Sequence, residues 1–198
     1  MEDLNMLTET VLGFSRQKEI PVKISKFCLE LVQLMLQNNF SLFHVEGSVE
    51  EFFKRHVDSL IEDEEIHLRE ASHGITLTLY QIDSSKSEKD IEKVTRRLMT
   101  LKSSIKSEKG LKERHAAVIR GSAIVLSEPH VISKNLPSLL TALSYFISDR
   151  SPISPLVRTT FSEFRRTHLD NWSADRQLFN EDQLDAIGEL LIAPSYYA

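Results

Sequence analysis

Apolar residues recur at the spacing of one helix face along most of the chain, and no other feature constrains the fold as strongly. Side chains three and four positions apart lie on the same side of an α-helix, whereas those of a half-buried strand alternate every second residue. Four segments show the helical spacing: Ile24, Phe27, Cys28, Leu31, Leu34 and Met35; Ile91, Val94, Leu98, Leu101 and Ile105; Leu139, Leu140, Leu143, Phe146 and Ile147; and Leu156, Val157, Thr160, Phe161 and Phe164. Only six Gly and six Pro interrupt the 198 residues, and no Asn-Gly or Asp-Gly hairpin turn is present. The sequence therefore predicts an all-α fold in which each stripe is the apolar face of a helix.

Polar and turn-forming segments separate these stripes. They are Pro21 and residues 44–48, 83–89, 107–110, 129–137 and 150–155. Such punctuation predicts about eight or nine helices joined by short connections, the usual layout of antiparallel helix pairs.

A short internal repeat indicates how the helices are stacked. Asp63 and Asp149 each end an apolar helical segment, and after a turn the next helix carries a hydrophobic-Arg pair at Arg69 and at Arg158. We expect each Asp and Arg to bridge neighbouring layers of helices. The pattern predicts a HEAT-like, armadillo-type α-solenoid, in which each helix pair shares its core only with its neighbours. A generic helical bundle is the alternative.

Composition and charge exclude several classes of protein. The chain is 41% hydrophobic and 27% charged, and 24 basic against 29 acidic residues give a net charge of −5. This charge disfavours nucleic acid and acidic lipid as partners. No apolar run reaches the ~20 residues that cross a bilayer, so we expect no membrane association. Cys28 is the single cysteine, which predicts a small core residue in a reducing compartment rather than a disulfide or a thiolate metal site.

The residue types that carry catalysis or hold cofactors show none of the required spacings. The seven His lack metal-ligand spacing, and the six Gly are scattered singly rather than gathered in a phosphate-binding loop. Ser122 follows Gly121 but lacks the flanking glycines of a nucleophile elbow, so it is interpreted as a small packing residue. We therefore expect no enzyme activity, no cofactor and no metal.

The carboxyl end has the chemistry of a docking peptide. Tyr196 and Tyr197 precede Ala198, whose terminal carboxylate can accept hydrogen bonds in a cleft of a partner. Pro194 lacks an N–H and restricts its own φ, so the preceding helix must end before it. The sequence thus predicts a helical domain over residues 1–193 and an extended docking tail over 194–198. A frayed end that packs its two Tyr on the last helix is the alternative.

Several segments resemble the carboxyl-terminal end of the giant HEAT-repeat proteasome activators. The resemblance is strongest over residues 161–172, 179–184 and 189–198. Residues 60–64 with 68–70, and residues 112–118, are similar to preceding repeats of the same family.

The resemblance implies a non-catalytic activator that needs neither ATP nor ubiquitin and works in the nucleus and cytoplasm. Its partners would be the α subunits of the proteasome core particle. The hydrophobic-Tyr-any tail of the family falls on Tyr196, Tyr197 and Ala198, which would enter a pocket of the α ring and promote gate opening. A plain helical-repeat scaffold for protein interactions is the alternative.

The family is also associated with acetylated histones in DNA repair through a bromodomain-like helical region. In this chain that region would lie before about residue 90. Acetyl-lysine readers use an Asn amide, and residues 79–84 contain no Asn. We therefore expect no acetylated-histone binding, although a histone-reading module is a further alternative.

Trp172 and the pair Arg165 and Arg166 have two interpretations. Trp172 would pack the last helix pair while the arginines meet Glu163, Asp170 or Asp175. In the second interpretation these side chains face the α ring or a bound polyanion.

Overall fold

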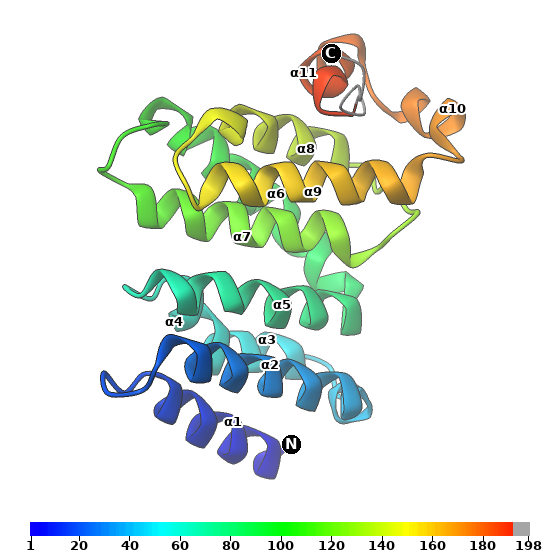
Figure 1. Cartoon of the computed structure of the whole chain (residues 1–198). Helices are drawn as coiled ribbons and strands as arrows, with labels where there is room; N and C mark the ends of the chain where they lie inside the picture. Colours follow the sequence, from blue (N-terminus) through cyan, green and yellow to red (C-terminus); the bar gives the residue numbers. More distant parts are fainter. Residues whose placement is uncertain (192–198) are drawn as a thin grey trace. The chain divides into compact units, whose positions relative to one another are not determined.

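The computed structural model describes residues 1–191, and this part of the chain is all-α (Figure 1). Helices and short 3-10 or π turns follow one another from Glu2 to Leu191, without a strand among the described residues. The predicted fold class of an α-solenoid with short connections is confirmed, whereas the HEAT-like assignment stays a prediction. In the described part, eight helices have nine or more residues, as predicted, and the helices α3, α4 and α10 are single turns.

The chain divides into two compact units. The first is Met1–Ser87 and the second begins at Glu88, so the boundary falls inside helix α6 (Ser84–Leu101). The predicted end of the helical domain at residue 193 lies outside the described residues.

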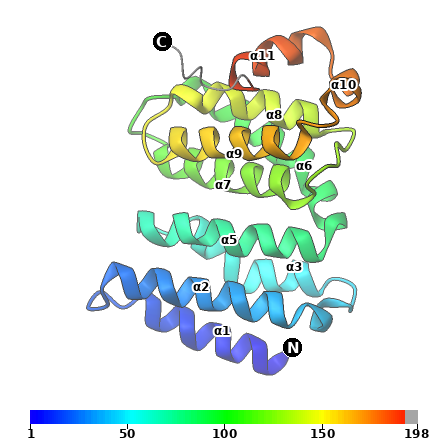
Figure 2. The ribbon, with the colours of Figure 1, turned by 45° about the vertical axis from the view of Figure 1, so that its right-hand side comes forward.

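The first unit is built around two contacts between long helices. Its elements are α1 (Glu2–Ser15), α2 (Val22–Asn38), η1 (Phe40–Phe43), α3 (Ser48–Phe52), the π turn η2 (Phe53–Val57), α4 (Asp58–Ile61) and α5 (Ile66–Ile82). Helix α2 lies between α1 and α5 (Figure 1, Figure 2). At Gly74 of α5 there is no space for a Cβ unless the Gln33 side chain of α2 moves, so these two helices approach closely.

The core of the first unit takes only part of the apolar stripe on α2. Cys28 is buried, as predicted, together with Leu29, Val32 and Leu36. In contrast, the side chains on the remaining side of the stripe are exposed. These are Ile24, Phe27, Leu31 and Leu34. The periodicity located an apolar side of the helix correctly, but α1 and α5 pack against a neighbouring side.

The second unit is built on α7 (Leu111–Ser127). It also contains α6 beyond the boundary, η3 (Lys102–Ser104), α8 (Leu136–Ser144), η4 (Tyr145–Ser148), α9 (Ile153–His168), α10 (Trp172–Asp175), η5 (Arg176–Leu178) and α11 (Glu181–Leu191). Helix α7 packs against α8 and α9. A Cβ at Gly121 of α7 would lie 3.1 Å from Leu143 Cδ2, so glycine permits the close approach of α8. Ser122 is fully buried and its hydroxyl lies 2.6 Å from that of Thr160, which confirms its interpretation as a packing residue.

The other three stripes are largely buried in this unit. The buried members are Ile91, Val94, Leu98, Leu139, Leu140, Leu143, Phe146, Val157, Thr160, Phe161 and Phe164. At about 1.5 to 3 kcal/mol for each fully buried large apolar side chain, these residues dominate the stability of the unit.

Two histidines of the first unit make its stability depend on pH. Burial lowers the pKa of His73 from 6.5 to about 4, and burial also lowers the pKa of His56, whose ring lies 3.0 Å from Asn5 Oδ1. Below about pH 6.5 the unfolded chain therefore binds protons that the folded unit excludes. We expect the free energy of unfolding to be constant above pH 7. It should fall by up to about 2 to 3 kcal/mol as the pH approaches 4.5.

Urea titrations followed by circular dichroism between pH 7.5 and 4.5 measure this change. The variant His73→Gln should lose most of the pH dependence, whereas His44→Gln, at an exposed position, should keep it. Equal slopes in the two variants would show that His73 is not the group responsible.

Candidate functional site

The three residues predicted to dock, Tyr196, Tyr197 and Ala198, lie outside the described residues, as does Pro194. The described chain ends with α11, which carries this tail. In the described part of the chain, α11 is the helix that precedes the predicted tail, and several contacts hold it on the second unit.

Helix α11 is attached by one apolar side. It packs against α8 and α9, and Ile187 is completely buried there. Phe179, just before the helix, is also buried. Full burial of one Ile and one Phe contributes about 3 to 6 kcal/mol, enough to hold a short helix in one place.

Side chains close the amino-terminal end of α11 in a reciprocal pair. Asn180 Oδ1 accepts a hydrogen bond from the Gln183 backbone N–H at 2.8 Å, and Gln183 Oε1 accepts one from the Asn180 N–H at 3.0 Å. This arrangement is a capping box, and it satisfies backbone donors that the first turn leaves unpaired. The Gln183 amide also lies 3.4 Å from Ser138 Oγ, which ties the cap to α8.

An aromatic cluster fixes the segment between α9 and α11. The ring of Trp172 lies 6.5 Å from that of Phe164 and 5.7 Å from that of Phe179. Beside them, the buried ring of His168 places Nδ1 2.8 Å from Asp175 Oδ2. The prediction that Trp172 packs the last helix pair is confirmed.

Of the pair Arg165 and Arg166, the second makes a contact that the packing interpretation predicted. Arg166 donates to Glu163 Oε2 at 2.8 Å within α9, as predicted. Asp175, another predicted partner, is engaged by His168 instead.

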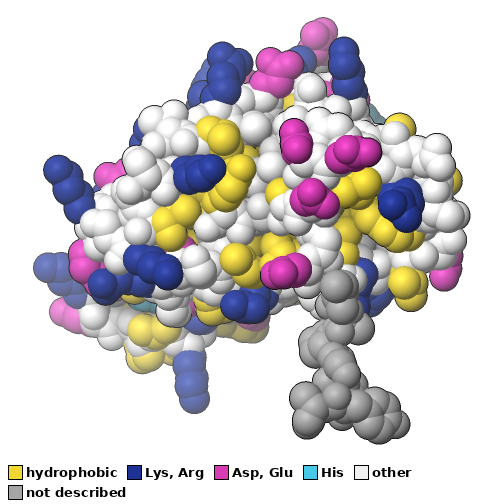
Figure 3. Space-filling view, turned by 90° about the horizontal axis from the view of Figure 1, so that it is seen from above, with side chains coloured by type: hydrophobic (Ala, Val, Ile, Leu, Met, Phe, Trp, Pro, Cys, Tyr) yellow, Lys and Arg dark blue, Asp and Glu magenta, His cyan; other side chains and the backbone are white. Residues whose placement is uncertain are grey.

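The outer side of α11 is acidic. Glu181, Asp182, Asp185 and Glu189 are all exposed, and the helix contains no Lys or Arg. Figure 3 shows several acidic side chains gathered on the face of the molecule that is seen from above. The element that carries the tail thus presents negative charge to solvent and would complement a positively charged surface of a partner.

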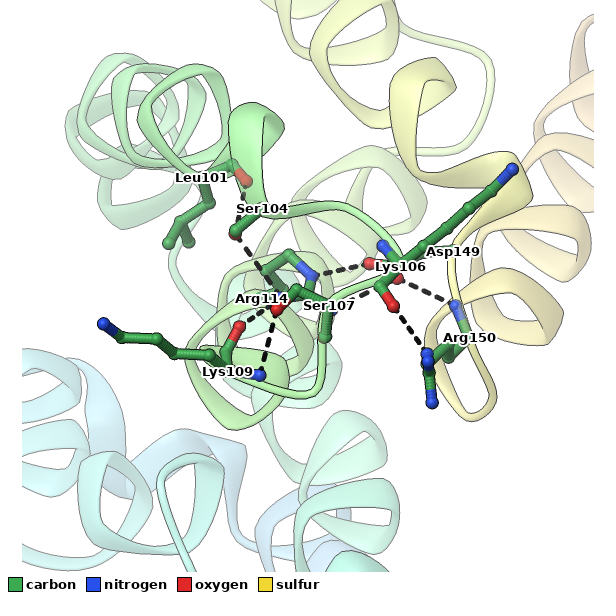
Figure 4. A network of polar contacts seen from close by, with 8 residues as sticks. All are labelled: Leu101, Ser104, Lys106, Ser107, Lys109, Arg114, Asp149 and Arg150. Atoms are coloured by element: carbon green, nitrogen blue, oxygen red, sulfur yellow. Dashed lines mark hydrogen bonds and ion pairs between the residues drawn. The ribbon is translucent and has the colours of Figure 1, made fainter.

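A buried ion pair joins the connection between α6 and α7 to the turn between α8 and α9 (Figure 4). The side chains of Arg114 on α7 and Asp149 after η4 are both fully buried. Arg114 Nε donates to Asp149 Oδ2 at 2.7 Å, and Nη2 donates to Oδ1 at 3.2 Å. The remaining guanidinium protons are directed to the carbonyl oxygens of Ser107, at 2.6 Å, and Lys109, at 3.0 Å, and to the Ser104 hydroxyl at 3.4 Å.

The Asp149 carboxylate is held ionised by these contacts. Burial alone would raise its pKa, but the hydrogen bonds from Arg114 and from the N–H groups of Lys106 and Arg150 lower it below its usual value. Those N–H groups lie 2.9 Å and 2.8 Å from Asp149 Oδ1. The carboxylate is fully buried and accepts four hydrogen bonds from the protein itself, so this network is structural.

Asp63 and Asp149 each pair with an arginine that the sequence repeat did not predict. Asp149 pairs with Arg114, whereas Arg158 is exposed, so the prediction for Arg158 is wrong. Asp63 accepts from Arg16, the residue that follows α1, at 3.2 Å, and Arg69 donates to the backbone carbonyl of Asp63. Each Asp does bridge layers, but towards an Arg that precedes it by 47 or 35 residues. A local sequence pattern cannot show such a distant partner.

Metal binding and membrane spanning have no structural basis in the described part of the chain. No group of His, Cys, Asp and Glu among residues 1–191 is placed to hold a metal ion. Over the same residues, every helix is too short or too polar to cross a bilayer. Cys28 is buried, and burial raises the pKa of its thiol.

These features define an all-α, solenoid-type chain. Its last described helix, α11, is held by its capping box and its apolar side, while its acidic side is exposed. Residues 111–198 match the family model described as proteasome activator complex subunit 4-like, C-terminal. Proteasome activator complex subunit 4 of Homo sapiens is 32% identical over 180 residues, which cover 85% of this chain and 10% of that protein. The protein of the same name from Xenopus laevis is 46% identical over 88 residues, 44% of this chain and 5% of that protein.

A plant relative shares the similarity. Proteasome activator subunit 4 of Arabidopsis thaliana is 29% identical over 150 residues, 72% of this chain and 8% of that protein. The chain therefore belongs to the proteasome activator complex subunit 4 family, and residues 111–198 correspond to its C-terminal region. It spans a tenth or less of the length of these relatives.

The buried ion pair gives a prediction for stability. Arg114→Ala should lower the free energy of unfolding by about 3 to 5 kcal/mol, because it leaves the Asp149 carboxylate buried without its partner. Arg166→Ala, which removes an exposed pair on the neighbouring α9, should cost less than about 1 kcal/mol. Urea unfolding at pH 7.5 distinguishes the two.

A double variant separates the charge from the packing. Arg114→Met with Asp149→Leu removes both charges and should recover much of the lost stability. If Arg114→Ala were as stable as Arg166→Ala, the network would not be required for the fold.

Proposed function

We propose that this chain is a non-catalytic regulatory module that binds the α ring of the proteasome core particle through Tyr196, Tyr197 and Ala198. The observation that carries the proposal is the match of residues 111–198 to the C-terminal family model, because it includes these three residues. The names of the relatives support a role in proteasome activation. We further propose that docking promotes gate opening without ATP or ubiquitin, wherever proteasomes are present in the nucleus and cytoplasm.

The chemistry of the tail supports docking into a pocket. A terminal carboxylate accepts charge-assisted hydrogen bonds from a Lys or from backbone N–H groups, which is a recurrent way of capturing a chain end. Tyr197 combines an apolar ring with a hydroxyl that can bond at the pocket wall, and Tyr196 can cover the apolar rim.

The clamped helix α11 supports the same proposal. Binding is weakened by the entropy of ordering whatever segment enters the pocket. The capping box of Asn180 with Gln183 and the buried Ile187 already fix the helix up to Leu191. Docking through the tail therefore carries no cost for ordering this helix.

Hydrolysis of a fluorogenic peptide by purified core particles tests the function. Adding the chain should raise the rate, and Tyr197→Ala or deletion of residues 196–198 should abolish the increase. Ser195→Ala, in the same tail but outside the hydrophobic-Tyr-any pattern, is the matched control and should retain it. Addition of one Gly after Ala198 should also abolish activation, because it displaces the terminal carboxylate.

The outcome also distinguishes the alternative of a helical-repeat scaffold. A scaffold would bind core particles equally well without residues 196–198. Full binding and full activation by the deletion variant would therefore contradict docking through the tail.

The free energies of burial and association predict that the isolated chain binds core particles weakly. Two Tyr side chains bury at most ~150 to 250 Å² each, worth about 4 to 6 kcal/mol apiece at ~25 cal/mol per Å². Association costs some ~4 to 15 kcal/mol in lost freedom. We expect a micromolar or weaker dissociation constant in a surface-binding assay with immobilised core particles. A nanomolar value would show that surfaces beyond the tail contribute strongly.

Acetylated-histone reading is disfavoured by the burial of the segment concerned. Leu79 and Tyr80, in the stretch that lacks an Asn, are completely buried at the end of α5. Titration with an acetylated histone tail peptide should give no binding, and a saturable signal that is absent with the unmodified peptide would contradict this.

A further inference from the structure

The connection between α6 and α7 carries a four-residue pattern that tail docking does not use. It reads Ile105-Lys106-Ser107-Glu108, an aliphatic residue directly before a lysine and a glutamate two positions after it. This is the order of side chains that the conjugating enzyme for small ubiquitin-like modifiers reads around an acceptor lysine. The aliphatic side chain packs on the enzyme, the lysine stem lies in the groove that leads to the enzyme's cysteine, and the carboxylate meets basic and hydroxyl groups.

The pattern is specific within this sequence. Of its twelve Lys, Lys106 alone lies between an aliphatic residue and a glutamate at the second position after it. Lys86 also has such a glutamate, Glu88, but it follows a serine. In addition, Lys86 is buried and its Nζ lies 2.9 Å from Glu50 Oε2, so that side chain is already engaged.

The structure places the pattern on an accessible connection. No helix covers the residues between Ser104 and Leu111. Lys106 and Glu108 are exposed, and Ile105 is half-buried. An enzyme that reads a short segment side chain by side chain needs such a connection, because a regular helix points successive side chains in different directions.

The backbone of Lys106 is held while its side chain is not. The N–H donates to Asp149 Oδ1 at 2.9 Å, and the carbonyl oxygen accepts from Arg150 Nε at 2.6 Å. The ammonium group makes no hydrogen bond or ion pair with any described residue. Figure 4 shows this side chain extending away from the polar network. The network therefore presents the Lys106 ammonium group to solvent from a fixed support.

The carboxylate of Glu108 can exchange its partner. It forms an ion pair with Arg150, and the two side chains are 71% and 51% exposed. Exposed pairs contribute little to stability, so an enzyme's basic group can replace Arg150 at low cost.

We propose that Lys106 is an acceptor site for a small ubiquitin-like modifier. The modifier is supplied as a thioester on the cysteine of its conjugating enzyme, after an activating enzyme has used ATP. Deprotonated Lys106 Nζ attacks the thioester carbonyl carbon, so that the C–N bond of an isopeptide forms, the C–S bond breaks and the cysteine thiolate leaves. The ammonium group loses two protons in all, one to solvent before the attack and one to the leaving thiolate.

Lys109 provides a matched control in the same connection. It is exposed, and its side chain makes no hydrogen bond or ion pair with a described residue. However, it follows Glu108 and precedes Gly110, so it lacks both the aliphatic residue and the glutamate of the pattern. A modification directed by exposure alone would not distinguish Lys109 from Lys106.

Reconstitution tests the proposal directly. The purified full chain is incubated with ATP, the activating enzyme, the conjugating enzyme and the modifier, and the products are separated by electrophoresis. One modifier should be added, and mass spectrometry of tryptic peptides should locate the isopeptide at Lys106. No adduct, or adducts spread over several lysines, would overturn the proposal.

Variants separate the pattern from general reactivity. Lys106→Arg should abolish the adduct because a guanidinium stays protonated, whereas Lys109→Arg should leave the rate unchanged. Glu108→Gln keeps the acceptor lysine and should slow the reaction about tenfold, the effect of losing one charge-assisted hydrogen bond. Circular dichroism should show equal helix content in all three variants. Equal rates for Lys106→Arg and Lys109→Arg would overturn the assignment to Lys106.

Two further arms test what is recognised. Arg150→Gln releases Glu108 and should be modified at least as fast as the unchanged chain, so a slower reaction would contradict recognition of the Glu108 carboxylate. Ubiquitin, supplied with its own conjugating enzyme, should show no preference for Lys106 over Lys109, because that enzyme does not read the pattern. The same preference with ubiquitin would overturn the assignment to this class of modifier.

Discussion

The buried pair of Arg114 and Asp149 is the contact on which the second unit depends. Its two residues are 35 positions apart, and together they join α7, the connection from α6 and the turn between α8 and α9 (Figure 4). The connection over residues 102–110 is mostly exposed and has little apolar surface to bury. Polar contacts therefore set its path, including the hydrogen bond to Asp149 from Lys106, which adopts a positive φ of 67°. A non-glycine residue takes that conformation only when its surroundings hold it there.

This arrangement connects the core to α11, the helix that precedes the proposed docking residues. Asp149 ends the segment that starts with α8, and α8 and α9 are the two helices on which α11 rests. A loss of the ion pair would disturb the turn between α8 and α9 and, through these two helices, α11. The stability of the second unit and the position of α11 are thus linked by the same packing.

Local patterns in the sequence were sufficient for the helical class and for most of the core. Three apolar stripes are largely buried, as the helical spacing implies, since long amphipathic helices have few other ways to shield an apolar face from water. The stripe on α2 shows the limit of this argument. Spacing locates the apolar sides of a helix, but Ile24 and Phe27 belong to a side that no described helix of the chain covers.

Long-range pairing escaped prediction for a related reason. The repeated Asp at positions 63 and 149 was found, but its partners Arg16 and Arg114 lie a helix pair away and carry no local signal. The capping box at Asn180 and Gln183 was present in the sequence as a polar pair three residues apart and could have been identified. Docking through Tyr196, Tyr197 and Ala198 was predicted from chemistry and resemblance and stays a prediction, because these residues lie outside the described part of the chain.

Photo-cross-linking from the tail to proteasome core particles tests the central claim most directly. The chain would carry a benzoyl-phenylalanine in place of Tyr196, with Leu169 replaced in the same way as the control at an exposed site of the second unit. The account predicts that irradiation joins position 196 to α subunits, and that position 169 gives no comparable product. Absence of an adduct from position 196, or equal adducts from both positions, would contradict docking through the carboxyl tail.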